Sequence, residues 1–344
     1  MGIRVGLIGL GTVGQAVARR LTDGRDSRMR LVRVCGRRGG RPRPAWLPRS
    51  VGWSERFESL LAPDIDVVVE LVGGVEQARR WTHQALLAGK SVVTANKQLV
   101  AEHGPEILSL SARQQCAFRY EGAVAGGVPI VRAVQDGLAG DRLVRVTGIL
   151  NGTCNYVLTR MEHDGLSFAD ALAEAKARGF AEADPTADID GFDARAKLSI
   201  LCSVGFGVRV HPAEIPCASI ARITADDLSR ARASGCTIRQ VSSAERVEGQ
   251  PGRVNGSVGP ALVALDGPLA RAEGCQNVVI VAGELGGETV FAGQGAGGNP
   301  TAVAVVSDVL AIRAGRDDRR PARPSLLWQP RPPIASTALF ERIE

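Results

Sequence analysis

The sequence predicts an α/β fold, in which a doubly wound parallel sheet is joined to a second, α+β domain. Three observations support this prediction. Short apolar runs alternate with helical segments over the first third of the chain, a glycine-rich turn joins the first run to the first helix, and the pattern changes after about residue 133. Strands that alternate with helices form parallel, doubly wound sheets. A chain of 344 residues is long for one hydrophobic core, so two domains are expected.

The first domain is expected to contain five strands and two clear helices. Each strand is a short run rich in Val, Ile or Leu, and each helix repeats apolar residues on one face. The strands are expected at residues 3–8, 31–35, 65–69, 91–94 and 117–120, and the helices at 13–21 and 76–88.

The second domain is expected to begin with a long strand at 143–150 and to end in a β-rich region. An open sheet of this kind can pair with a twin, so this domain is expected to bind substrate and to form a homodimer. Its helices are expected at 152–163, 167–177 and 191–204, and its further strands near 236–247, 253–259, 278–282 and 289–292.

The turn after the first strand carries a dinucleotide-binding pattern. Gly9, Gly11 and Gly14, with Thr12 and Val13 between them, match G-x-G-x-x-G between a strand and a helix. The glycines allow a tight turn and a close approach of the backbone to a pyrophosphate, which the helix N-terminus binds. We therefore expect a Rossmann-type NAD(P)-binding domain instead of a tight turn without a ligand.

A last helix is expected to return the chain to this domain. Asn299 followed by Pro300 is a strong helix start, and the helical pattern runs to about Arg313. The expected boundaries are therefore 1–132 plus 296–315 for the NAD(P)-binding domain and 133–295 for the substrate-binding and dimerisation domain. Residues 316–344 are rich in Arg and Pro and are expected to form an irregular tail.

The residues after the second strand favour NADP over NAD. A carboxylate at this position would bind the 2′-hydroxyl of NAD. Here Cys35 and Gly36 are followed by Arg37 and Arg38, whose guanidinium groups suit the 2′-phosphate of NADP. The alternative is that both arginines belong to a solvated basic loop, which leaves NAD possible.

The motif T-A-N-K places Thr94 and Lys97 just past the carboxyl end of the fourth strand. Ligands of open α/β sheets bind at this edge. Lys97 can therefore reach a substrate carboxylate or the nicotinamide, and Thr94 and Gly73 are included among the expected cofactor contacts. The alternative is that Asn96 caps a helix and Lys97 is simply exposed.

The segment from Gly179 to Lys197 is the most acidic part of the chain. Asp193 and Lys197 are four residues apart, so they share one face of a helix. Acids around one lysine can hold a substrate's ammonium group and tune a proton-transfer group. The alternative is a solvated helix start, in which Asp190 is the cap and Asp193–Lys197 is a weak surface pair.

Two further turns carry possible binding groups. Gly152 and Thr153, between a strand and a helix, can present a backbone N–H and a hydroxyl to a ligand carboxylate. The small-residue turn from Glu121 to Pro129 can wrap a hard cation with its carbonyls and one carboxylate. From the residues alone, a flexible domain junction is the stronger interpretation of that second turn.

Composition argues against several other classes of protein. The seven cysteines form no C-x-x-C pair and the four histidines lack metal-ligand spacing. No signal peptide and no bilayer-spanning apolar run is found, so we expect a cytoplasmic protein without a membrane partner. The net charge of +6 comes with no nucleic-acid motif, so an anionic small molecule is the expected partner and nucleic acid is not.

Six segments, in order from about Ile3 to Leu310, together resemble the homoserine dehydrogenase family. They are G-L-G-T-V-G, T-A-N-K, the turn from Glu121 to Pro129, G-I-L-N-G-T, G-F-A-E-A-D-P-T-A-D-I-D-G-F-D and G-A-G-x-x-P-T-A. The resemblance implies the NAD(P)H-dependent interconversion of L-aspartate 4-semialdehyde and L-homoserine, in threonine and methionine biosynthesis.

The resemblance also implies catalytic and substrate-binding roles. Lys197 matches the general acid/base, and Lys97 matches its partner near substrate and nicotinamide. The carboxylates that hold the substrate ammonium and the lysine match Glu182 and Asp193. Neighbouring positions of the substrate pocket match Gly152, Thr153 and Asp188.

A cofactor contact and a cation site follow from the same resemblance. Gly297, in a second glycine-rich entry to a helix, matches a cofactor contact. A site for Na⁺ or K⁺ built mostly from carbonyl oxygens matches Glu121, Val124, Gly126 and Val128.

Departures from the family pattern leave alternatives open. Phe180 replaces a usual tyrosine, so only its backbone can contact the substrate. The alternatives are therefore a reductase of another 2-amino aldehyde, a non-catalytic NADP-sensing protein, or nucleic-acid binding through the Arg-rich tail. The chain also lacks the regulatory ACT-type domain of many bacterial members, from which we expect insensitivity to threonine.

Overall fold

The computed structural model describes residues 2–36, 42–250, 252–315 and 327–330, which fall into two compact units. The described residues of Met1–Pro129 and Ala296–Pro321 form unit 1, and those of Ile130–Gly295 and Ala322–Glu344 form unit 2. The division falls three residues earlier than the expected boundary. It precedes α4 (Ile130–Arg132), which continues directly into the helical turn η3 (Ala133–Gly137), so a boundary at 132 would cut one helical segment.

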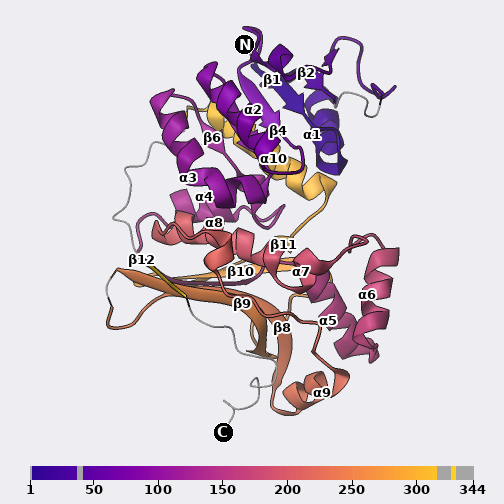
Figure 1. Ribbon diagram of the computed structural model, residues 1–344, viewed down its shortest axis with the longest axis vertical. Coiled ribbons are helices and arrows are strands. Elements are labelled where there is room, and N and C mark those ends of the chain that lie inside the picture. Colours follow the sequence, from indigo (N-terminus) through magenta and orange to yellow (C-terminus); the bar gives the residue numbers. More distant parts are fainter. Residues whose placement is uncertain (1, 37–41, 251, 316–326, 331–344) are drawn as a thin grey trace. The chain divides into compact units, whose positions relative to one another are not determined.

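Unit 1 is built on a parallel sheet of six strands in the order β3-β2-β1-β4-β5-β6 (Figure 1). The order reverses direction between β1 and β4, which is the switch point where ligands of doubly wound sheets bind. The predicted parallel sheet is confirmed, although β3 is too short to show a periodicity in the sequence. The strands are β1 (Ile3–Ile8), β2 (Met29–Cys35), β3 (Gly52–Ser54), β4 (Val67–Glu70), β5 (Ser91–Thr94) and β6 (Phe118–Arg119).

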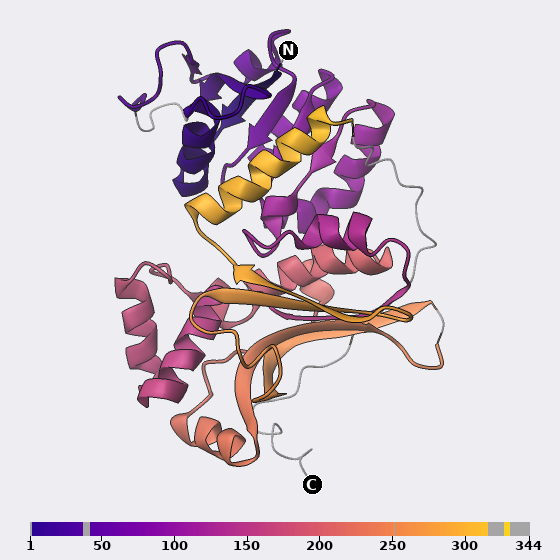
Figure 2. The same cartoon turned by 180° about the vertical axis from the view of Figure 1, so that it is seen from behind.

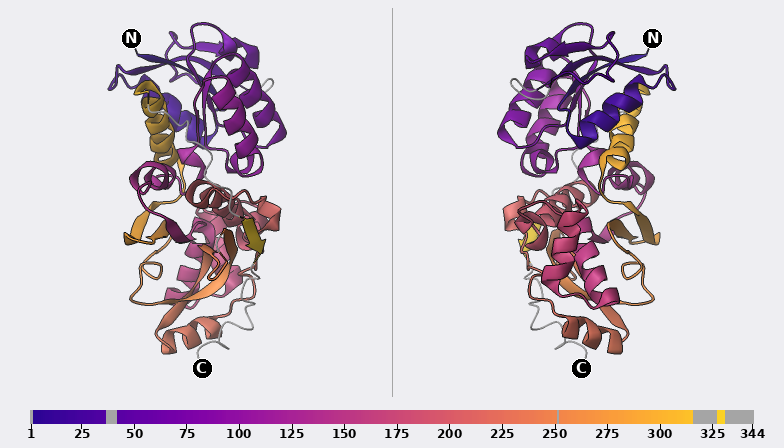
Figure 3. Two further views of the ribbon diagram at one scale, coloured as in Figure 1. Left: turned by 90° about the vertical axis from the view of Figure 1, so that its left-hand side faces the viewer. Right: turned by 90° about the vertical axis from the view of Figure 1, so that its right-hand side faces the viewer.

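Helices cover both faces of this sheet. On one face α1 (Thr12–Thr22) and α10 (Gly298–Arg313) lie side by side, as Figure 3 shows, and Figure 2 shows α10 running along the sheet. The opposite face is covered by α2 (Glu76–Leu87) and α3 (Lys97–Arg113). The full length of α3 is not apparent from the sequence, because Gly104 and Pro105 interrupt its helical pattern. Two short turns complete the unit: η1 (Phe57–Leu61) and η2 (Glu121–Ala123).

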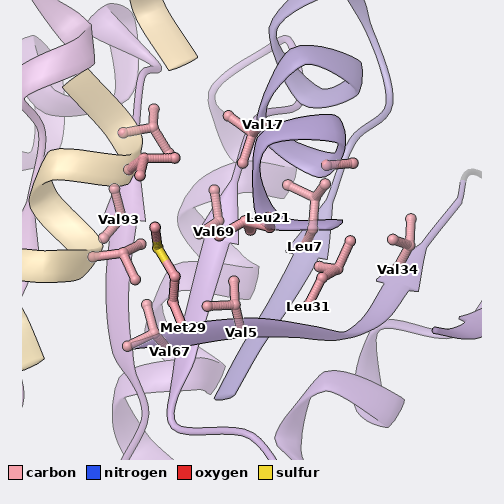
Figure 4. Packing of buried hydrophobic residues seen from close by; sticks show 14 of the residues in the cluster. Val5, Leu7, Val17, Leu21, Met29, Leu31, Val34, Val67, Val69 and Val93 are labelled. Atoms are coloured by element: carbon pink, nitrogen blue, oxygen red, sulfur yellow. The ribbon is translucent and has the colours of Figure 1, made fainter. Parts of the chain in front are cut away.

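The core of unit 1 lies between the sheet and the pair α1 and α10. Val5 and Leu7 of β1 have no exposed surface and belong to one apolar cluster with Val17 and Leu21 of α1 (Figure 4). Val305 of α10 belongs to the same cluster and is also fully buried. Hydrophobic burial therefore fixes the starts of α1 and α10 at the carboxyl edge of the sheet.

Unit 2 contains a six-stranded sheet in the order β11-β10-β7-β8-β9-β12, with α5 and α8 packed on it. The pairs are antiparallel except for β9 and β12, which confirms the predicted α+β domain. The strands are β7 (Leu143–Ile149), β8 (Cys236–Arg246), β9 (Arg253–Ala264), β10 (Gln276–Gly283), β11 (Gly287–Gln294) and β12 (Leu327–Pro330). The helical segments are α5 (Gly152–Asp164), α6 (Phe168–Ala177), α7 (Thr186–Ile189), α8 (Phe192–Phe206), η4 (Pro212–Glu214) and α9 (Ala225–Ala233).

The expectation of an irregular tail over 316–344 is wrong for residues 327–330. Strand β12 pairs in parallel with β9, and the ring of Trp328 packs within 3.0 Å of where a Cβ on Gly256 would lie. Pro330 is tolerated because β12 is an edge strand, where a missing N–H leaves no ladder bond unmade. Four residues between Arg- and Pro-rich flanks give no strand signal in the sequence. Across the part of the chain that the structure describes, none of the helices has the length and apolarity needed to cross a membrane.

Candidate active site

The nucleotide-binding turn of unit 1 is tightly constrained. Gly9 has φ +94°, and a Cβ on Gly9 would lie 2.5 Å from the carbonyl oxygen of Leu71. A Cβ on Gly14 would clash with the carbonyl oxygen of Gly9, so neither position accepts a side chain. Gly11 and Thr12 are exposed, Val13 is half-buried, and no side chain caps α1. The first N–H groups of α1 therefore remain available to bind a phosphate.

The start of α10 lies beside the start of α1. Gly297 has φ +119°, and a Cβ on Gly298 would lie 3.1 Å from the carbonyl oxygen of Thr12. No side chain caps α10 either. Two helix N-termini with partial positive charge thus lie at one edge of the sheet, and this arrangement suits a pyrophosphate.

The turn after β5 combines both interpretations of the T-A-N-K motif. The Asn96 side chain accepts the Leu99 N–H at 3.1 Å and so caps α3, and half-buried Lys97 is the first residue of that helix. Thr94 is fully buried and donates its hydroxyl to Glu70 Oε2 at 2.6 Å. Gly73 lies in the turn that follows Glu70. Sequence analysis missed Glu70, although an acid that ends the run Val67–Val69 is a visible signal.

A buried ion pair lies on α8 of unit 2, beside the Leu150 carbonyl that follows β7. Lys197 Nζ donates to Asp193 Oδ2 at 2.7 Å and to the Leu150 carbonyl oxygen at 2.6 Å. Asp193 is 6% exposed and Lys197 8%, so the interpretation as a weak surface pair is wrong. Burial strengthens the attraction between the charges but also removes their hydration, so a pair of this kind depends on well-placed partners.

Asn151 connects this pair to a second carboxylate. Its Nδ2 donates to Asp193 Oδ2 at 2.9 Å and to Asp188 Oδ1 at 2.6 Å, while its Oδ1 accepts the Cys154 N–H and caps α5. Burial raises the pKa of Asp188, and the nearby Asp193 carboxylate raises it further. Sequence analysis did not select Asn151, because its role depends on carboxylates that lie about forty residues further along the chain.

The start of α8 differs from the expected one. Gly191, with φ +83°, precedes the helix, and Asp190 instead ends α7. The predicted Asp190 cap is therefore wrong, because the left-handed turn at Gly191 begins α8 without a capping side chain. This turn places Asp193 and Lys197 on the buried face.

The remaining predicted substrate residues lie around the start of α5. Thr153 donates its hydroxyl to the Phe180 carbonyl oxygen at 2.7 Å, while the Phe180 ring packs on Tyr156 with centroids 4.9 Å apart. A Cβ on Gly152 would lie 2.9 Å from the Cys275 carbonyl oxygen, so packing also requires this glycine. Glu182 lies on an exposed stretch, whereas Asp188 is half-buried and Asp193 and Lys197 are buried.

The predicted cation turn is strongly curved. Glu121 is 2% exposed, and its N–H donates to Asp308 Oδ2 at 2.8 Å. Ala125 and Gly126 both have positive φ, +53° and +50°, and Val124 and Val128 are buried. Backbone carbonyls and one carboxylate are the hard oxygen donors that a cation such as Na⁺ or K⁺ accepts, so the donor set fits. Arg37 and Arg38, the predicted 2′-phosphate ligands, lie outside the described residues.

A doubly wound sheet with a phosphate-binding turn, joined to a unit with a buried lysine–carboxylate pair, defines a nicotinamide-dependent oxidoreductase. Residues 129–310 match the family model of homoserine dehydrogenase, and residues 9–121 match that of its NAD-binding domain. The chain belongs to the homoserine dehydrogenase family.

Individual relatives agree with this assignment. The chain is 40% identical to homoserine dehydrogenase of Bacillus subtilis over 90% of its length and 72% of the relative. It is 41% identical to homoserine dehydrogenase of Synechocystis, over 91% of this chain and 73% of the relative. A solved homoserine dehydrogenase from Thiobacillus denitrificans has a TM-score of 0.87 at 36% identity. The match covers 96% of this chain and 80% of the solved chain. A hyperthermophilic archaeal homoserine dehydrogenase in complex with NADPH has a TM-score of 0.78 at 26% identity. That match covers 93% of this chain and 100% of the archaeal chain.

These matches confirm the predicted family, the oxidoreductase class and a nicotinamide cofactor. They also confirm the predicted reaction, the NAD(P)-dependent interconversion of homoserine and aspartate semialdehyde. None of them supports another 2-amino aldehyde substrate, an NADP-sensing role or a nucleic-acid partner.

We predict that Gly14→Ala weakens NADPH binding at least tenfold, about 1.4 kcal/mol, because the new methyl group displaces the Gly9 carbonyl and opens the turn. Fluorescence titration with NADPH measures the dissociation constant. Gly137→Ala is the matched control, since its Cβ meets open space at an ordinary φ. An unchanged dissociation constant in Gly14→Ala would contradict the assignment of this turn.

Proposed function

We propose that Lys197 is the general acid/base of the reaction and that Asp193 holds it in place. The observation that supports this is the buried geometry of the Lys197 ammonium, fixed by Asp193 and by the Leu150 carbonyl. An ammonium group has three N–H donors, and these two bonds leave the third for a substrate oxygen. The Asp193 carboxylate accepts one N–H of the ammonium group and so fixes the position from which a proton would be donated.

In the direction of reduction, the bound nicotinamide supplies a hydride to the aldehyde carbon. Negative charge then develops on the aldehyde oxygen, and the Lys197 ammonium stabilises that charge and transfers a proton to it. The C=O bond becomes a C–OH bond, and neutral Lys197 regains its proton from solvent. In the direction of oxidation, Lys197 first loses a proton to solvent, and the neutral amine then accepts the hydroxyl proton.

The carboxylates of Asp188, Asp193 and Glu182 are proposed to bind the substrate's ammonium group. Asp188 and Asp193 are connected through Asn151, and Glu182 adds a carboxylate on an exposed stretch. Gly152 and Thr153 begin α5, where backbone N–H groups suit the substrate carboxylate. Phe180 is proposed to contact the substrate through its backbone carbonyl, which accepts a hydrogen bond from the Thr153 hydroxyl.

Unit 1 is proposed to bind the cofactor and to contribute the second lysine. Gly9, Gly11, Thr12, Val13, Gly14 and Gly297 would hold the pyrophosphate, and Gly73 and Lys97 would face the nicotinamide. Thr94, which is fully buried and bonded to Glu70, would act on the cofactor only indirectly. NADP is the proposed cofactor, supported by Arg37 and Arg38 in the sequence, with NAD as the alternative. The turn at Glu121, Val124, Gly126 and Val128 is proposed to bind Na⁺ or K⁺.

The chain is further proposed to act in the cytoplasm, within threonine and methionine biosynthesis, as a homodimer. All seven cysteines are free, as expected of a reducing compartment. A dimer is supported by β11, an edge strand of unit 2 on which Val290 is 46% exposed.

We expect Lys197→Ala and Lys97→Ala each to lower kcat at least a hundredfold, because each removes a proposed proton-transfer or charge-stabilising group. NADPH affinity should stay within about twofold in Lys197→Ala. Steady-state oxidation of homoserine, followed at 340 nm, gives kcat and KM. Lys176→Ala removes an exposed lysine of unit 2 and is the control. Near-wild-type turnover in Lys197→Ala would refute its assignment as the acid/base.

The cofactor and cation proposals share one assay. We expect a higher kcat/KM with NADP than with NAD, and higher activity in NaCl or KCl than in choline chloride of equal ionic strength. A bound cation should also raise the thermal unfolding midpoint, because ligands of the native state stabilise it. Equal rates and midpoints in all three salts would eliminate the cation site, and a preference for NAD would reverse the cofactor assignment.

Sedimentation velocity tests the proposed homodimer. We expect a species of twice the 36.2 kDa chain mass at micromolar concentration. Val290→Lys should shift the distribution toward the monomer, because it places a charge on the exposed edge strand. A single monomeric species for the unmodified chain would overturn the proposal.

A further inference from the structure

Glu70 is a buried acid that the proposed reaction does not use. It ends β4 after three buried valines and is itself only 1% exposed. Burial raises the pKa of its carboxyl to about 7, against the opposing effect of hydrogen bonds from Thr94 and Val72. A carboxyl at such a place costs folding free energy, so its presence calls for a role that an apolar residue could not fill.

The Glu70 carboxyl joins two turns at the carboxyl edge of the sheet. Its Oε1 accepts the Val72 N–H at 2.7 Å, and its Oε2 accepts the Thr94 hydroxyl at 2.6 Å. Thr94 Oγ1 in turn accepts the Asn96 N–H at 2.9 Å. Glu70 thus contacts the turn after β4 directly and reaches the turn after β5 through one hydroxyl.

The Asn96 side chain forms a second link between the turn after β5 and the turn after β4. Its Nδ2 donates to the Gly74 carbonyl at 2.7 Å and to the Val72 carbonyl at 3.3 Å, while its Oδ1 caps α3. Every bond in this set has a defined direction, from donor to acceptor. The position of the first residue of α3, which is Lys97, therefore depends on the same bonds that shape the turn 71–74.

We propose that Glu70 is a positioning residue, which locks the turn 71–74 to Thr94 and Asn96 and thereby places Lys97 for the reaction. This inference rests on the proposed role of Lys97. Glu70 acts through the two turns and not on the substrate. A carboxylate is required because both of its oxygens must accept hydrogen bonds, one from a backbone N–H and one from a hydroxyl.

The variant Glu70→Gln tests whether the hydrogen bonds of the carboxylate, and not only its volume, are needed to position Lys97. The glutamine has the same volume and can still accept the Val72 N–H, but its NH₂ group faces Thr94 Oγ1. That hydroxyl then receives two donors, and its own hydrogen loses its acceptor. We expect kcat to fall at least tenfold. Binding of ADP-ribose or its 2′-phosphate, which lack the nicotinamide, should stay within twofold by calorimetry, because the Glu70 carboxyl bonds to Val72 and Thr94 and not to the phosphate turn Gly9–Gly14.

Glu55→Gln is the control, since it makes the same chemical change at an exposed residue of unit 1. A kcat for Glu70→Gln within twofold of wild type would overturn the inference. So would a parallel loss of ADP-ribose binding, which would indicate general damage to unit 1.

A second pair of variants keeps the test decisive if Glu70→Gln does not fold. Thr94→Val removes the hydroxyl at nearly constant volume, whereas Thr94→Ser retains it. We expect kcat of the serine variant to exceed that of the valine variant at least fivefold, and a ratio near one would contradict the inference. Lys97→Ala in the same assay separates the two proposals. If it retains turnover, the role of Lys97 fails; if it is inactive while Glu70→Gln is not, only the role of Glu70 fails.

Discussion

The buried ion pair between Lys197 and Asp193 is the interaction on which the proposed chemistry depends. Two charges removed from water are tolerated only where other groups complete their hydrogen bonds. Here the Leu150 carbonyl and the Asn151 amide supply them, and both belong to the junction between β7 and α5. The pair therefore requires α8 to be docked on that junction, and Gly191 with its left-handed backbone allows α8 to begin where it does. A pair of apolar residues would fill the space at lower cost, but it could not move a proton.

The same logic applies to the carboxyl edge of the unit 1 sheet. Glycines without room for a Cβ shape the turn after β1, whereas buried or half-buried polar side chains shape the turns after β4 and β5. The glycines leave backbone N–H groups free to bind a phosphate. The polar side chains fix the position where α3 begins. Hydrophobic packing of α1 and α10 against β1 then holds both helix starts at this edge. Apolar burial therefore provides the frame, and a few directed hydrogen bonds set the positions of the reactive groups.

Much of this arrangement could be predicted from the sequence. Short apolar runs rich in Val, Ile or Leu gave β1, β2, β4 and β5, and the glycine spacing gave the phosphate turn. The strands β3 (Gly-Trp-Ser) and β12 (Leu-Trp-Gln-Pro) were missed because neither contains a run of β-branched or aliphatic residues. Asn151 and Glu70 were missed for another reason: each is an ordinary polar residue until its partners, remote in the chain, are brought to it. The helix start at Asp190 was misjudged because capping statistics favour Asp, whereas glycine alone adopts the turn at 191 without strain.

The central claim is that the Lys197 ammonium, oriented by Asp193 and Leu150, is the group that exchanges a proton with the substrate oxygen. A crystal structure of the ternary complex with homoserine and the oxidised cofactor tests it most directly. The account predicts Lys197 Nζ within about 3.2 Å of the homoserine hydroxyl oxygen, with the Asp193 contact retained. A hydroxyl oxygen that instead contacts another ionisable group, with Lys197 out of hydrogen-bonding range, would contradict it.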